Sequence, residues 1–120
     1  MIMKIDAIVR EEKFEDVKNA LMEIEVNGLT VSQVMGCGLQ RGYKEIVRGM
    51  EVEPQMQPKI KFEIVVSSEE WADKTIEAIK KAAYTGEYGD GKIFSYPVAS
   101  AVKIPVSYTH LRAHETLRHL

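Results

Sequence analysis

The sequence has few of the features that mark several large classes of protein. It has one cysteine in 120 residues, so it can form neither an internal disulfide nor a cysteine-rich zinc site. Its formal net charge is only −2, and it has no clustered basic face of the kind that binds nucleic acid. No apolar run approaches the length of a membrane span, and the N-terminus lacks the pattern of a secretory signal. We therefore expect a cytoplasmic protein that does not bind nucleic acid.

What is present is typical of one ordinary globular domain. Apolar residues make up 45% of the chain and charged residues 28%. A chain of 120 residues can bury a core of its own but leaves little room for a second folded domain.

The first half of the chain has the pattern of a strand, a helix and a strand. Residues 4–9 place Ile5, Ala7 and Val9 on one face, which predicts a strand with at least one buried side. Apolar residues then recur at spacings of three and four, which predicts a helix that ends at Asn27-Gly28 and packs through Phe14, Val17, Leu21 and Ile24. Residues 29–35 are rich in β-branched side chains and predict a second strand, which the glycines of residues 36–38 end.

The second half repeats this order. Residues 59–66 predict a strand, and residues 67–70 (Ser-Ser-Glu-Glu) have the form of a capping box. A helix that Gly86 ends follows, with an apolar face of Ala72, Ile76, Ile79 and Ala83. Residues 92–98 predict another strand, and residues 101–104 a short final one.

Two such units in succession predict an α+β fold, the ferredoxin-like double βαβ sandwich. In this fold both helices cover one face of a four-stranded antiparallel sheet. Apolar side chains on the other face would most simply be buried by self-association, so we expect a homo-oligomer.

A long segment without periodicity separates the two units. It runs from residue 39 to residue 58, and connections longer than about 12 to 15 residues are uncommon in compact domains and usually functional. We interpret it as a mobile, exposed recognition loop. The alternative is a β-hairpin extension around residues 43–47.

Two glycine-containing segments could bind a ligand through the backbone. Residues 85–92 (Thr-Gly-Glu-Tyr-Gly-Asp-Gly-Lys) combine glycines, which let N–H groups approach a phosphate closely, with a lysine charge. The motif is not a Walker loop, because its Gly-Lys leads into a strand and no Ser or Thr follows. Residues 36–38 (Gly-Cys-Gly) are the second segment. The two could form one site across a subunit interface, or each could be an unrelated turn.

Four stretches together resemble the PII signal-transduction proteins. They are residues 4–9 (Lys-Ile-Asp-Ala-Ile-Val), 28–31 (Gly-Leu-Thr-Val), 36–42 (Gly-Cys-Gly-Leu-Gln-Arg-Gly), and 85–94, with Thr85-Gly86 and Gly-Asp-Gly-Lys-Ile-Phe at 89–94. The resemblance covers residues 1–104, which we take as one PII-like domain.

The resemblance implies a homotrimer in which ATP and ADP compete for three clefts between subunits. It assigns the phosphates to Gly89, Asp90, Gly91 and Lys92, with Lys103 in place of a family arginine. It places Thr30 and Val65 beside the adenine, and Gly36 and Gly38 where the backbone approaches the nucleotide. It also implies that Gln40 helps to coordinate the Mg²⁺ between ATP and 2-oxoglutarate, and that Lys59 pairs with a 2-oxoglutarate carboxylate.

In that family the long loop, called the T-loop, docks on targets such as ammonium channels, which would recruit the protein to the membrane. Arg48 lies where the family has its channel-contacting arginine, and Tyr43 is a second expected target contact. The family's uridylylated tyrosine falls at Val52 and its phosphorylated serine at Met50. We therefore expect regulation by ligands alone.

The sequence departs from the family near the nucleotide and at its C-terminus. Leu39 replaces an arginine near the phosphates, at a cost of about 1.5 to 3 kcal/mol if that arginine bonds a phosphate. Pro105 replaces another arginine. Residues 105–120 carry all three histidines and have the composition of an appended or vector-derived tail, disordered or weakly helical. The spacing from His114-Glu115 to His119 is one residue too long for a zinc-protease motif.

The resulting expectation is a non-enzymatic sensor of nitrogen, carbon and energy status that acts on nitrogen-metabolism proteins by binding them. One alternative is a PII-like sensor of another ligand, such as bicarbonate or a cyclic nucleotide. The other is a small ferredoxin-fold enzyme, such as a slow ATPase, although no nucleophile, base and orienting group occur together.

Overall fold

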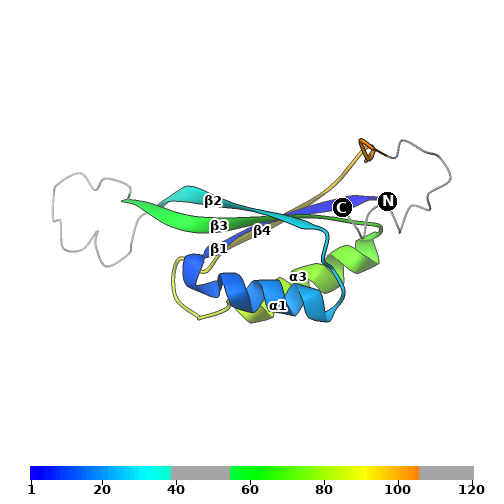
Figure 1. Ribbon diagram of the computed structural model, residues 1–120. Helices are drawn as coiled ribbons and strands as arrows, with labels where there is room; N and C mark the ends of the chain where they lie inside the picture. Colours follow the sequence, from blue (N-terminus) through cyan, green and yellow to red (C-terminus); the bar gives the residue numbers. More distant parts are fainter. Residues whose placement is uncertain (39–54, 106–120) are drawn as a thin grey trace, which may run out of the picture.

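The computed structural model describes residues 1–38 and 55–105 (Figure 1). The elements follow in the order β1 (Met3–Arg10), the 3-10 helix η1 (Glu11–Lys13), α1 (Phe14–Glu23), β2 (Leu29–Gly38), β3 (Gln55–Val66), α3 (Glu69–Ala83) and β4 (Gly91–Pro97). The four strands form one antiparallel sheet in the order β2-β3-β1-β4. Both long helices lie on the same face of this sheet, so the predicted ferredoxin-like α+β fold is confirmed.

The core lies between the helices and the two central strands. In the ladder between β1 and β3, Ile5 pairs with Ile64 and Ala7 with Phe62. These four residues are fully buried. Both helices add the apolar faces that the sequence predicted: Val17 and Leu21 of α1, and Ala72, Ile79 and Ala83 of α3, are buried.

The helix α1 ends four residues earlier than its sequence predicts. The prediction placed the end at Asn27-Gly28, but the last helical residue is Glu23. Glu25 takes a left-handed conformation with φ of 63°, and the Val26 N–H donates to the Leu21 carbonyl at 2.9 Å. This is the Schellman arrangement, in which a non-glycine residue occupies the position that glycine usually fills. Because Val26 and Leu21 are both buried in the core, packing holds the strained residue in place.

The helix α3 begins with a serine cap rather than a full capping box. The Ser68 hydroxyl accepts a hydrogen bond from the Trp71 N–H at 3.1 Å. With Ser68 as the cap, the third helical position is Trp71 and not a glutamate, so the reciprocal bond of a capping box cannot form.

The sheet differs from the sequence prediction at two places. The β2–β3 ladder continues to the pair Gly38–Gln55, so the last four residues of the expected loop 39–58 belong to β3. The hairpin alternative around residues 43–47 lies outside the described residues. The predicted strand over residues 101–104 is wrong for this chain, because that segment has no ladder partner in the described part of the molecule.

The face of the sheet opposite the helices is more polar than expected. The pairing register places Lys4, Asp6 and Glu63 on it, and the Lys4 ammonium bonds the Glu63 carboxylate at 2.8 Å. The Tyr96 hydroxyl donates to Asp6 at 2.6 Å. The expected apolar surface is therefore reduced to isolated side chains between charged groups, of which Phe94 is the most exposed at 51%.

Two neighbouring residues of α1 test the position of the core. We expect Leu21→Ala to lower the free energy of unfolding by about 2 to 5 kcal/mol, because Leu21 is fully buried and the substitution leaves a cavity. Met22→Ala is the matched control, since Met22 is 52% exposed, and it should change the value by no more than about 0.5 kcal/mol. Urea unfolding followed by circular dichroism gives both values. Equal losses would contradict the orientation of α1.

Candidate functional site

The turn between α3 and β4 carries the glycine motif that the sequence analysis singled out. Three of its glycines have positive φ: 84° at Gly86, 94° at Gly89 and 120° at Gly91. Non-glycine residues rarely adopt these values, so the spacing of the glycines sets the path of the backbone. We call residues 85–91 the glycine turn.

The carboxylate of Asp90, near the end of the glycine turn, accepts hydrogen bonds from the residues at its start. One oxygen accepts the backbone N–H groups of Thr85 at 2.8 Å and Gly86 at 3.0 Å. The other accepts the Thr85 hydroxyl and, at 3.1 Å, the Nε of Arg10. Both oxygens therefore have partners within the chain, and the carboxylate closes the turn as a side-chain cap would.

These contacts stabilise the ionised form of Asp90. Burial alone would raise the pKa of this carboxyl group, but the hydrogen bonds from Thr85, Arg10 and Gly86 outweigh it and hold the pKa well below its usual range. Asp90 is therefore a fixed negative charge that structures the turn.

Two cations of the sheet also hold carbonyl groups of the glycine turn. The Nη2 of Arg10 donates to the Tyr88 carbonyl at 2.5 Å, and the Nζ of Lys59 donates to the Gly89 carbonyl at 2.8 Å. Arg10 and Lys59 are paired across β1 and β3, so they approach the turn side by side.

Other groups pass close to two of the glycines, to different degrees. A Cβ on Gly91 would lie 1.9 Å from the carbonyl oxygen of Ile8 on β1, which is closer than any real contact. A Cβ on Gly36 would lie 3.2 Å from the Cγ of Lys59. The missing side chain of Gly36 thus gives the Lys59 stem room to reach the Gly89 carbonyl.

The residues that the resemblance assigned to the nucleotide, together with Lys59, which it assigned to 2-oxoglutarate, form two groups at opposite ends of the sheet. One end holds Lys59, Gly36, Gly38 and the segment Gly89–Lys92. The other end holds Thr30 and Val65, and the chain leaves β4 toward Lys103 there (Figure 1). The six residues from Lys59 to Val65 correspond to about 20 Å along the strand.

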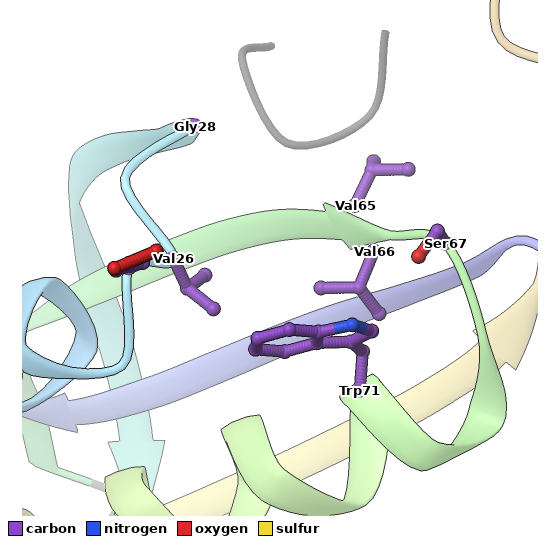
Figure 2. Close-up of a pocket in the computed structure, with 7 residues that line it drawn as sticks. Val26, Gly28, Val65, Val66, Ser67 and Trp71 are labelled. Atoms are coloured by element: carbon purple, nitrogen blue, oxygen red, sulfur yellow. The ribbon is translucent and has the colours of Figure 1, made fainter. Parts of the chain in front are cut away.

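A shallow groove lies near the second end, on the helix side of the sheet. Val26, Val66 and Trp71 point into it, while the Val65 side chain points to the other side (Figure 2). Its lining is mostly apolar, and its free interior is about the size of one water molecule. The groove is therefore separate from the glycine turn and too small for a nucleotide.

Sequence reasoning missed Arg10 and the role of Thr85. Arg10 lies 80 residues from Asp90 in the chain, so only the sheet pairing brings them together. The predicted ligand and target contacts Gln40, Tyr43 and Arg48, like Leu39, lie outside the described residues.

Comparison with known proteins identifies the family. The family model described as nitrogen regulatory protein P-II matches residues 2–107. The chain belongs to the P-II family. It is 50% identical over 101 residues to nitrogen regulatory protein P-II 1 of Methanothermobacter thermautotrophicus, covering 84% of this chain and 87% of that protein. It is 45% identical to nitrogen regulatory protein P-II of Pasteurella multocida, covering 84% of this chain and 89% of that one.

Solved P-II structures share the fold of the chain. The Bacillus subtilis GlnK–ATP complex superposes with a TM-score of 0.72 at 34% identity, covering 89% of this chain and 92% of that one. Arabidopsis thaliana PII bound to citrate gives a TM-score of 0.69 at 33% identity, covering 89% of this chain and 83% of that one. The relatives are named as regulatory proteins of nitrogen metabolism, which supports a signalling rather than a metabolic role.

Two glycine-to-alanine variants test the packing at the P-II glycine turn. We expect Gly91→Ala to destabilise the chain by at least about 2 kcal/mol, because its φ of 120° and the Ile8 carbonyl both exclude a Cβ. Gly36→Ala is the control, since only the flexible Lys59 side chain must move, and its cost should stay below about 1 kcal/mol. Urea unfolding measures both, and a harmless Gly91→Ala would contradict this backbone path.

The lowered pKa of Asp90 predicts a defined pH dependence. A carboxyl group whose pKa is lower in the folded state stabilises the fold above its unfolded pKa of about 4, and the contribution is lost as the pH falls toward the folded value. We therefore expect Asp90→Asn to destabilise the chain at pH 7, and the gap from wild type to shrink below about pH 4.

The measurement is urea unfolding of both proteins at several pH values from 7 to 3. Asp73→Asn, which removes an exposed aspartate of α3, gives the effect of losing one negative charge elsewhere. A gap between Asp90→Asn and wild type that does not change with pH would show that the Asp90 charge does not matter.

Proposed function

We propose that the protein is a P-II signal-transduction protein that senses energy and carbon status through ATP or ADP and 2-oxoglutarate, and regulates nitrogen-metabolism proteins by binding them. The observation that carries this proposal is the convergence of the glycine turn, Lys59 and Gly36 at one end of the sheet. The GlnK structure with ATP is a family precedent for a nucleotide ligand.

The phosphates would bind at the end of the sheet that holds the glycine turn. Glycines let N–H groups approach an anion closely, and Lys92, at the start of β4, adds an exposed positive charge. Asp90 is the exception among the residues assigned to the phosphates. Because its oxygens are bonded to Thr85, Gly86 and Arg10, we assign its side chain to shaping the turn and only its backbone to the nucleotide.

The adenine would bind beside Thr30 and Val65 of a neighbouring subunit. In one chain these residues lie about 20 Å from Lys59, measured along the strands. Two copies placed with the glycine turn of one beside the Val65 end of the next would bring the two groups together. Lys103 would then join the same cleft from the neighbour. This arrangement supports an oligomer with the nucleotide between subunits, and we propose a homotrimer because the resemblance to the P-II family implies one.

Lys59 has the chemistry to bind a 2-oxoglutarate carboxylate. Its ammonium group has three N–H donors, and the Gly89 carbonyl uses one of them. It can therefore hold the turn and a carboxylate at once. Citrate in the Arabidopsis protein is a precedent for a polycarboxylate ligand in the family. We assign Mg²⁺ to phosphate and carboxylate oxygens together with the Gln40 amide, since this hard ion prefers oxygen ligands.

The output would pass through the T-loop, with Arg48 and Tyr43 as target contacts and an ammonium transporter or another nitrogen-metabolism protein as the target. In the described residues, no helix has the length and apolarity to cross a membrane. We therefore propose that any membrane association comes from binding such a transporter. The proposed role is not enzymatic.

Titration calorimetry, together with light scattering to determine the oligomeric state, tests this function. We expect a trimer by light scattering, ATP binding, and 2-oxoglutarate binding only when Mg²⁺ and ATP are present. Lys59→Gln should weaken 2-oxoglutarate binding about ten- to hundredfold through the loss of a charged hydrogen bond.

Lys61→Gln is the matched control, since Lys61 lies two residues further on the same face of β3 and pairs with Ile8 rather than Arg10. Its 2-oxoglutarate affinity should stay within about threefold of wild type, given that surface substitutions change free energies little. A monomer in light scattering, or 2-oxoglutarate binding that does not depend on ATP, would contradict the proposal.

A further inference from the structure

Arg10 and Lys59 fix the direction of two successive peptide groups in the glycine turn. Arg10 holds the Tyr88 carbonyl at 2.5 Å and Lys59 holds the Gly89 carbonyl at 2.8 Å. The two cations are neighbours across β1 and β3, so both carbonyl oxygens point toward the same side of the turn.

The N–H groups of the same two peptides must then point the other way. A trans peptide is planar, with its C=O and N–H on opposite sides. The structure has no cis peptide in its described residues, so this applies to the Gly89 and Asp90 N–H groups. Neither N–H has a hydrogen-bond partner in the described part of the chain. Two successive N–H groups that face the same way form a concave site for an anion.

Arg10 links the two sides of Gly89. Its Nη2 bonds the carbonyl before Gly89, and its Nε bonds the Asp90 side chain after it, at 3.1 Å. A Cβ on Gly89 would lie only 3.3 Å from Nη2, so the guanidinium is packed against the turn. The planar guanidinium has the several fixed donors that this double contact needs, whereas a lysine ammonium is a single point.

We infer that Arg10 is a positioning residue for anion binding: it holds the glycine turn in the shape that presents the Gly89 and Asp90 N–H groups to a polyphosphate. Arg10 acts through the turn, since its Nε donates to the Asp90 carboxylate and its Nη2 to the Tyr88 carbonyl. The inference rests on the proposed function for the identity of the ligand as a nucleotide, but not for the shape of the turn.

The test measures the affinity of Arg10→Gln for ATP, AMP and inorganic tripolyphosphate by calorimetry. We expect ATP and tripolyphosphate to bind about ten- to hundredfold more weakly, because charged hydrogen bonds that shape the turn are lost. AMP, which lacks the β- and γ-phosphates, should lose less than about threefold. Arg10→Lys should fall between wild type and Arg10→Gln, since it keeps the charge but not the fork of donors.

Lys13→Gln is the matched control. Lys13 lies three residues after Arg10 in the chain, and the substitution removes a cation together with its 3.6 Å ion pair with Asp16. Its affinities should equal those of wild type. Should Arg10→Gln not fold, Arg10→Lys carries the same comparison. Equal losses for ATP and AMP would show a general structural effect and overturn the inference, as would unchanged affinities.

The result also separates this inference from the proposed function. If wild type binds tripolyphosphate in an Arg10-dependent way but not ATP, the inference stands and the nucleotide function fails. If wild type binds ATP and Arg10→Gln binds it equally well, the function stands and the inference fails. If wild type binds neither, both fail.

Discussion

The site depends on one interaction, the closure of the glycine turn by the Asp90 carboxylate. The chain must reverse between α3 and β4, and it does so through three glycines with positive φ. Such a segment has many accessible conformations when unfolded, so fixing it is entropically costly. The bonds from Asp90 to Thr85, Gly86 and Arg10 select one conformation. The placement of Lys92 and of the N–H groups that we propose to bind an anion follows from that choice.

A second constraint is the length of the sheet. The strands keep the glycine turn and the Val65 end about 20 Å apart, and no side-chain motion within one chain closes that distance. A ligand that needs both ends therefore needs two chains. The uncovered face of the sheet, with charged side chains between isolated apolar ones, is a surface on which another chain could pack through specific ion pairs as well as apolar contacts.

The fold could be predicted from the sequence because its apolar residues recur at the regular spacings of strands and helices. Alternation in β1 and the spacing of three and four in α1 and α3 depend on neighbours in the chain, and the structure confirms the buried faces they indicate. The glycine turn could also be located, because its motif is a short stretch of neighbouring residues. The end of α1 could not, because Glu25 adopts a left-handed conformation that only the packing of Val26 makes favourable.

The partners within the site needed the structure. Arg10 meets Asp90 across 80 residues, and Lys59 meets Gly89 across 30, through the register of β1, β3 and β4. No local pattern encodes that register. The prediction of a strand at residues 101–104 was wrong for a related reason: an extended segment becomes a strand only when it pairs with another, and residues 101–104 pair with none of the described strands. The sequence predicts Gly36 as a ligand contact, and the structure shows that Gly36 also leaves room for the Lys59 side chain.

The most direct test is a structure determined from crystals of the protein that are grown with ATP. We expect the phosphates to lie against the glycine turn of one subunit, and the adenine against Thr30 and Val65 of the next. A nucleotide held within a single chain, or bound away from the turn, would contradict this expectation.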